Sequence, residues 1–210
     1  MTKITKKPRR RMGIYAGVSL VALLALIAAV VLSSGNNDSG GMPQDVAVTI
    51  TGESLPAFAG DPNSDPGLGM TAPILSGQGF DGQTIAVTDD GRPKLILFLA
   101  HWCPHCQREV PAVQTYADEI GFPDSADVYS VSTSHSPSRP NWPPSAWFER
   151  EGWTFPVIVD DPESSAHQAY GQGAFPYYVF LDSAGRVALR LSGEQDPVAL
   201  AQLIGQLAGF

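Results

Sequence analysis

A continuous apolar run, "KLILFLA" over residues 94–100, ends just before the only two cysteines of the chain. Apolar runs of this length without alternation are typical of strands that are buried on both faces of a helix-covered sheet. The residues from Pro104 to Ile120 have helical composition and follow this run closely. Cys103 and Cys106 are therefore predicted at a junction where a buried strand passes into a helix.

Short strand patterns alternate with helical patterns over the rest of the chain from about Val46. Asp196 and Pro197 are typical of the N-cap and the first position of a closing helix. The order is βαβ followed by a hairpin and a helix, which predicts one α/β domain. The expected strands cover 46–51, 84–87, 127–134, 156–160, 177–182 and 186–193, and the remaining expected helices cover 143–152 and 164–171.

The N-terminal segment differs sharply from the rest. Residues 1–12 hold six basic residues and no acidic one, and residues 13–32 hold no charge. A helix of twenty residues rises about 30 Å, which matches the hydrocarbon thickness of a bilayer. Basic residues on one side predict that this side stays in the cytoplasm. We therefore expect a cytoplasmic basic tail over 1–12, a single transmembrane anchor over 13–32, a flexible linker over 33–45 and an extracytoplasmic domain over 46–210.

A cleaved signal peptide is the alternative, because "VLSSG" over 31–35 offers small residues. The apolar segment of such a peptide usually has only about 7–15 residues, which favours an uncleaved anchor in the cell membrane. Both interpretations place the domain where disulfides can persist.

The domain is acidic. Beyond residue 32 the chain holds seven basic and 21 acidic residues, a net charge of −14. Binding to phosphates needs clustered Lys and Arg, so this composition argues against a nucleic-acid partner.

The spacing of the two cysteines suits redox chemistry. At a helix start, Cys103 lies beside unsatisfied N–H groups and the positive end of the helix dipole, which favours the thiolate. Cys106 falls on the same helix face one turn later and can close a ring with it. Pro104 fixes φ at the helix start, and a protonated His105 lowers the pKa of Cys103 further. The motif thus predicts an attacking thiolate and a resolving thiol, with no cofactor.

Other uses of the two thiols stay open. A structural zinc site needs about four ligands and would have to recruit histidines, whereas a staple that closes so short a ring removes little unfolded-state entropy. A copper or zinc carrier could combine the cysteines with His135 or His167. A tethered interaction module with incidental thiols is the third alternative.

The stretch "LILFLAHWCPHCQREVP", with Trp102 directly before the first cysteine, resembles the active-site strand and helix of the thioredoxin superfamily. Over roughly residues 69–208 the chain is similar to TlpA-like, membrane-anchored thiol-disulfide oxidoreductases, which share sequence with the AhpC/TSA redoxins. The resemblance implies a thioredoxin-like fold with a central mixed sheet flanked by helices. It also implies protein thiols and disulfides as partners outside the cytoplasm, with a redox partner embedded in the membrane.

The family carries a cis-proline that faces the cysteines, and Pro176 in "GAFPYYVF" matches its place. The resemblance therefore implies a cis Phe175–Pro176 bond, although only about 5–6% of X-Pro bonds in folded proteins are cis. The exposed backbone there would pair with a client chain.

Three departures limit what carries over. Leu97 stands where thioredoxins place a buried Asp, so protons would move through water, His105 or Glu109. We expect Glu109 on an exposed helix face, where such a residue usually only solvates the surface. The Pro-His dipeptide resembles that of the oxidant DsbA, whereas the family resembles reductases, so the direction of electron flow stays open. Ala100 stands in the position of a peroxidatic Thr or Ser, which argues against peroxidase activity.

The loop over 132–145 is long and rich in proline. It either presents His135 and Trp142 beside the site as a docking lid, or merely connects elements with Trp142 packed on the body.

Overall fold

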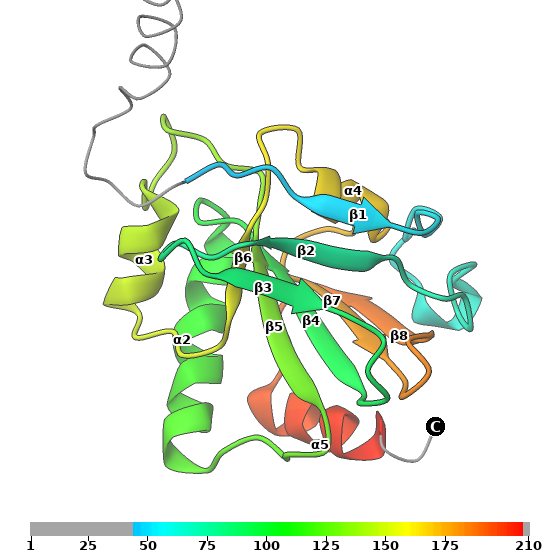
Figure 1. Ribbon diagram of the computed structural model, residues 1–210. Helices are drawn as coiled ribbons and strands as arrows, with labels where there is room; N and C mark the ends of the chain where they lie inside the picture. Colours follow the sequence, from blue (N-terminus) through cyan, green and yellow to red (C-terminus); the bar gives the residue numbers. More distant parts are fainter. Residues whose placement is uncertain (1–43, 208–210) are drawn as a thin grey trace, which may run out of the picture. The chain divides into compact units, whose positions relative to one another are not determined.

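The computed structural model describes residues 44–207, so the expected tail and anchor and nearly all of the linker lie outside the described residues. A five-stranded mixed sheet, with strand order β6-β5-β4-β7-β8, forms the centre of the domain (Figure 1). The middle strand β4 (Lys94–Leu99) runs parallel to β5 (Asp127–Ser132) and antiparallel to β7 (Tyr177–Leu181). This confirms the predicted central mixed sheet.

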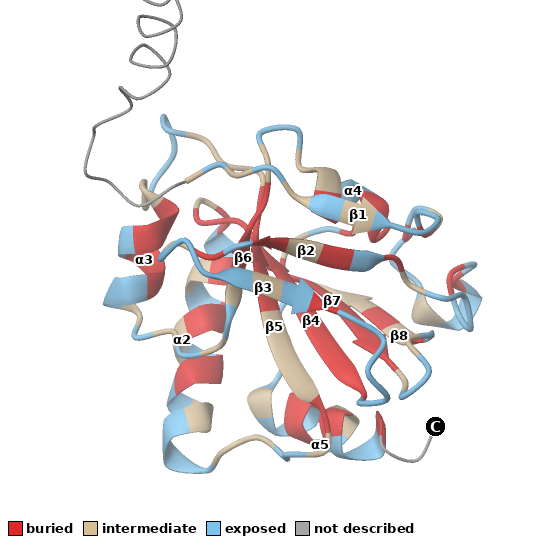
Figure 2. Ribbon diagram, viewed as in Figure 1, coloured by how far each residue is buried: buried red, intermediate tan, exposed pale blue. Residues whose placement is uncertain are grey.

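The edges of the central sheet are β6 (Val157–Val159) and β8 (Val187–Ser192). All six residues of β4 are buried, as expected for the apolar run (Figure 2). Since side chains alternate along a strand, β4 contributes to two cores. Leu95, Leu97 and Leu99 belong to one buried cluster. Ile96 and Phe98 belong to the other.

Helices cover the first of these cores. The cluster around Leu97 includes residues of α2 (Pro104–Glu119), α3 (Pro144–Arg150) and α5 (Pro197–Leu207). The predicted N-cap of α5 is confirmed, because Asp196 Oδ1 accepts hydrogen bonds from the backbone N–H groups of the second and third helix residues at 2.9 and 3.1 Å.

A second, three-stranded antiparallel sheet packs over the other core. It consists of β1 (Thr49–Thr51), β2 (Ile74–Gln78) and β3 (Thr84–Val87), in that order (Figure 1). The strand β2 is not among the predicted strands, because its glycine weakens the pattern. That glycine is Gly77, and a Cβ there would lie 2.7 Å from the side chain of Ile158, so it allows β2 to approach β6 closely.

Two short helical elements complete the domain, the 3-10 helix η1 (Pro62–Ser64) and α4 (Ser165–Ala169). A fully buried ion pair between Asp65 and Arg190 links the segment after η1 to β8. Within residues 44–207, every helix is too short or too polar to cross a membrane.

Candidate active site

The two cysteines lie at the predicted junction of strand and helix. β4 ends at Leu99, and Cys103 is the N-cap residue of α2, with Pro104 in the first helical position. The Cys103 N–H donates to the Ala100 carbonyl at 3.0 Å, which closes a tight turn after the strand. Both cysteines are free thiols and both are buried, although Cys103 keeps 6% of its surface exposed and Cys106 none. A reagent therefore reaches Cys103 first.

The two thiols have opposite electrostatic environments. A hydrogen bond from the Cys106 thiol lowers the pKa of Cys103 to about 5, against the opposing effect of burial. The backbone N–H groups of Cys106 and His105 and the charge of His105 act in the same direction. Burial raises the pKa of Cys106, and the negative charge of Cys103 adds to this. At neutral pH the pair is thus one thiolate beside one thiol.

The Phe175–Pro176 peptide bond is cis, as the resemblance implied, and so is the Trp142–Pro143 bond. The Phe175 carbonyl faces Cys103, with 3.7 Å between its oxygen and Sγ. The segment before β7 therefore borders Cys103.

Glu109 is buried, with 3% of its surface exposed, so the expected exposed position is wrong. The face of α2 that carries it packs against β7 and the loop after β8. Its carboxylate accepts hydrogen bonds from the Tyr178 hydroxyl and from the Gln195 backbone N–H. Burial raises the pKa of Glu109 to about 7. Its charge also helps to raise the pKa of Cys106, so the two groups sense each other.

Glu109 thus places a carboxyl group one helical turn beyond Cys106, although Leu97 occupies the β4 position where thioredoxins carry a buried Asp. Leu97 is buried in β4 and pairs with Tyr178 of β7, which holds Glu109. Here α2 supplies the acid instead of β4.

His105 and Arg108 form an exposed cluster with Glu194, which follows β8. His105 Nδ1 lies 2.6 Å from Glu194 Oε1, and Arg108 Nε donates to both carboxylate oxygens at 3.1 Å. Hydrogen bonds from Arg108 and then from His105 lower the pKa of Glu194 to about 2. Sequence reasoning missed Glu194, because 89 positions separate it from His105 and no local pattern marks it.

The loop before α3 touches the other side of the site. Trp102 Nε1 donates to the Ser134 carbonyl at 2.7 Å, and the guanidinium of Arg139 lies 4.1 Å from the centroid of the Trp102 ring system. Trp142 packs edge-on against His101 at 5.8 Å between centroids. The loop therefore reaches the site through Arg139, while Trp142 packs on the body.

The His135 ring forms its hydrogen bonds with Asp45 and Ser132 rather than with either thiol. His167 Nε2 bonds the Gly173 carbonyl at 2.9 Å. Within the part of the chain that the structure describes, no group of three or more His, Cys, Asp or Glu residues is arranged to hold a metal ion.

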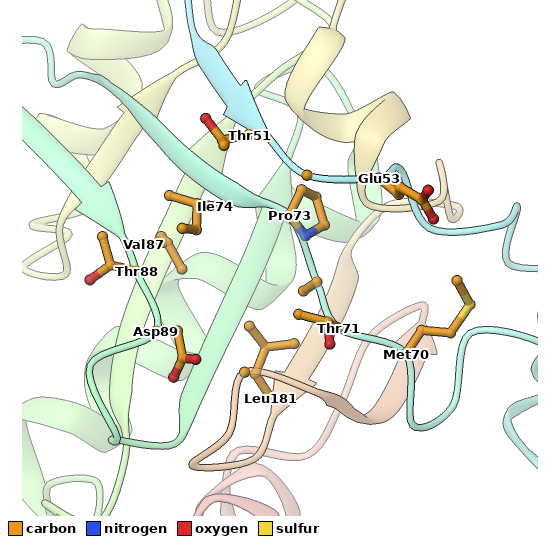
Figure 3. Close-up of a pocket in the computed structure, with 13 residues that line it drawn as sticks. Thr51, Glu53, Met70, Thr71, Pro73, Ile74, Val87, Thr88, Asp89 and Leu181 are labelled. Carbon is orange, nitrogen blue, oxygen red and sulfur yellow. The ribbon is translucent and has the colours of Figure 1, made fainter.

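A pocket of about 540 Å³ is lined by residues at the ends of β1, β2, β3 and β7 (Figure 3). Pro73, Ile74 and Val87 contribute apolar side chains to it. Leu181, which also lines it, pairs with Lys94 at the start of β4, whereas the cysteines follow the end of that strand. The two cysteines therefore lie away from this pocket.

A strand-to-helix junction with two unlike thiols, on a mixed sheet, defines the thioredoxin class of proteins. The chain belongs to the AhpC/TSA family, whose model matches residues 68–190. It is a TlpA-like thiol-disulfide oxidoreductase of the thioredoxin superfamily.

Relatives with this activity support the assignment. The chain is 28% identical to the thiol-disulfide oxidoreductase ResA of Geobacillus thermodenitrificans, over 60% of this chain and 70% of that protein. It is 25% identical to the thiol:disulfide interchange protein HelX of Rhodobacter capsulatus, over 83% and 84%. StoA from Bacillus subtilis shares the fold, with a TM-score of 0.54 and 20% identity over 65% of this chain and 98% of that chain.

Proposed function

We propose that the protein exchanges disulfides with protein clients outside the cytoplasm through Cys103 and Cys106, and that residues 13–32 anchor it in the membrane. The observation that carries the proposal is the contrast between the two thiols. Cys103 has a pKa of about 5 and keeps some exposure, whereas Cys106 is fully buried and has a raised pKa. An accessible thiolate with low pKa attacks, and a shielded thiol resolves.

In the reducing direction, the Cys103 thiolate attacks one sulfur of a client disulfide. A mixed disulfide forms, and the other client sulfur leaves as a thiolate. Cys106 then loses its proton and attacks Cys103 Sγ, which forms the Cys103–Cys106 disulfide and releases the second client thiolate. Two electrons pass to the client, and the released thiolates take up two protons. Oxidation of a client is the same sequence in reverse.

Glu109 is the proton acceptor in this scheme. A thiol with a raised pKa attacks only after it loses its proton, and a buried base supplies the acceptor. The carboxyl of Glu109 lies one helical turn beyond Cys106 and has a pKa of about 7, near the pH at which a general base works best. His105 assists instead at the surface, where its charge favours the Cys103 thiolate.

The client chain is placed against the segment that precedes β7. The Phe175 carbonyl lies beside Cys103 Sγ, and Trp102 packs edge-on against the Phe175 ring at 6.1 Å between centroids. A client backbone that pairs with the segment at Pro176 would bring its sulfur to Cys103. Trp102 would form one wall of this approach.

The test is to trap the intermediate with the full-length protein in detergent. Cys106→Ser should accumulate a mixed disulfide with a disulfide-bonded client protein, because no thiol remains to resolve it. Cys103→Ser should trap almost none, since Cys106 is inaccessible. The wild type should turn over without accumulation. Equal trapping by the two variants, or none by either, would refute the assigned roles.

A further inference from the structure

Arg139 is an exposed residue that packs on the neighbour of the candidate nucleophile. Its guanidinium stacks on Trp102, the residue directly before Cys103, at 4.1 Å from the ring centroid. Stacking of this kind uses the flat face of the guanidinium and leaves its N–H edges directed outward. The stacked group is therefore oriented to bind a carboxylate in a bidentate manner.

The loop that carries Arg139 is tied to the residue before Trp102. His101 Nδ1 lies 2.7 Å from the Pro140 carbonyl, and His101 Nε2 accepts from the Ser136 backbone N–H at 3.2 Å. Asn141 Nδ2 donates to the His101 carbonyl at 3.1 Å. Because His101 is fully buried, these bonds fix the loop to the same turn that positions Cys103.

Arg139 has no acidic partner within residues 44–207. The described part of the chain holds six arginines, and four of them form ion pairs with carboxylates: Arg92, Arg108, Arg150 and Arg190. Arg139 and Arg186 do not. Arg186 lies in the turn between β7 and β8, near the start of β4 and away from the cysteines.

The strongly acidic charge of the domain makes an arginine without an acidic partner, such as Arg139, unusual. The chain beyond residue 32 carries a net charge of −14, which repels acidic partners in general. On the other side of the cysteines, Glu194 neutralises the charge of Arg108. Within residues 44–207, Arg139 is thus the arginine near Cys103 that forms no ion pair with a carboxylate.

We infer that Arg139, stacked on Trp102, is a subsite for a carboxylate of the client polypeptide close to the cysteine that Cys103 attacks. The inference rests on the proposed function and adds a preference among clients. Arg139 binds an Asp or Glu side chain of the client, or its C-terminal carboxylate, and so orients the client disulfide. The proteins best exchanged carry an acidic residue a few positions from the reactive cysteine.

The experiment uses the reduced full-length protein and a set of cyclic disulfide peptides. Each peptide carries one Glu at a position near the cysteine, and its twin carries Gln there. The ratio of the second-order rate constants, Glu over Gln, measures the preference. For an exposed charge pair we expect a ratio of about three at the best position. The ratio should fall toward one at high salt.

Three variants make the test specific. Arg139→Gln should bring the ratio to one. Arg139→Lys should leave an intermediate ratio, because lysine keeps the charge but lacks the paired N–H groups that bind a carboxylate in a bidentate manner. Arg186→Gln removes an equal charge far from the site and should leave the ratio unchanged.

The opposite outcomes are equally clear. A ratio near one in the wild type, or a ratio that survives in Arg139→Gln, would overturn the inference. An equal loss in Arg186→Gln would show that net charge alone causes the preference, which also overturns it. Failure of the wild type to exchange with the Gln peptides would refute the proposed function itself, and the subsite with it.

Discussion

The carboxylate of Glu109 lies buried on the same face of α2 as Cys106, one helical turn further along the helix. Tyr178 and the backbone of Gln195 hold it there, and its pKa of about 7 lets it exchange a proton near neutral pH. In the proposed mechanism, the chemistry of the two cysteines therefore depends on this third residue of α2.

Replacing Glu109 by Gln should slow the step in which Cys106 attacks the mixed disulfide. Loss of a general base costs about a hundredfold in such steps. In the wild type this step should become about tenfold slower for each pH unit below about 7, since the carboxylate must be ionised to accept the proton. Single-turnover release of the second thiolate from a chromogenic aromatic disulfide measures it.

The matched control is Glu119→Gln, at the exposed end of the same helix. It removes an equal charge and should leave the rate and its pH dependence unchanged. A wild-type pH profile that Glu109→Gln reproduces would remove Glu109 from the mechanism.

The same substitution should change the pH dependence of stability. Burial raises the pKa of Glu109 from 4.5 to about 7, so the folded state favours the protonated form. The stability of the wild type relative to Glu109→Gln should therefore be highest below about pH 4.5 and fall by about 3 kcal/mol as the pH rises through 7. Urea unfolding of both reduced proteins at low and high pH measures this. A constant difference between them would contradict the raised pKa.

The causes of the low pKa of Cys103 can be ranked by mutation. The hydrogen bond from Cys106 lowers this pKa most, and the charge of His105 lowers it less than the backbone N–H groups of Cys106 and His105 do. Cys106→Ala should therefore raise the pKa of Cys103 by more than about one unit, and His105→Gln by clearly less. Thiolate absorbance against pH measures both. A larger effect from His105→Gln would reverse this ranking.

The buried pair of Arg190 and Asp65 should matter for stability alone. Arg190 Nε donates to Asp65 Oδ2 at 2.8 Å, and its guanidinium also donates to the carbonyls of Pro56 and Tyr170. Arg190→Met leaves the Asp65 carboxylate buried without its cationic partner and with the Gly67 backbone N–H as its remaining donor, which costs about 3–5 kcal/mol. Urea unfolding should show this loss, and adding Asp65→Asn should recover part of it. A loss below about 1 kcal/mol would show that water reaches Asp65 in the variant.

Local features predicted much of this site. The apolar run of β4 and the cysteines at a helix start are adjacent in sequence, so one pattern revealed strand, junction and thiols together. The cap of α5 was predicted for the same reason, because Asp196 and Pro197 are neighbours.

Features that depend on distant packing could not be predicted in this way. The sequence predicts Glu109 as a surface residue, because β7 and the loop after β8, which cover its face of α2, are distant in the sequence. The strand β2 depends on its pairing with β1 and β3. Gly77 weakens its strand pattern in the sequence, but the missing side chain allows β2 to pack closely on Ile158. Glu194 and Arg139 reach the site only through the folded arrangement of two loops.

The most direct test of the account is the pH dependence of alkylation of the reduced wild type by iodoacetamide, with mass spectrometry to locate the label. Between about pH 4 and pH 9, the label should appear on Cys103, with a midpoint near pH 5, while Cys106 stays unmodified. A midpoint near 9 for Cys103, or labelling of Cys106 first, would contradict the assignment of an attacking thiolate and a shielded resolving thiol.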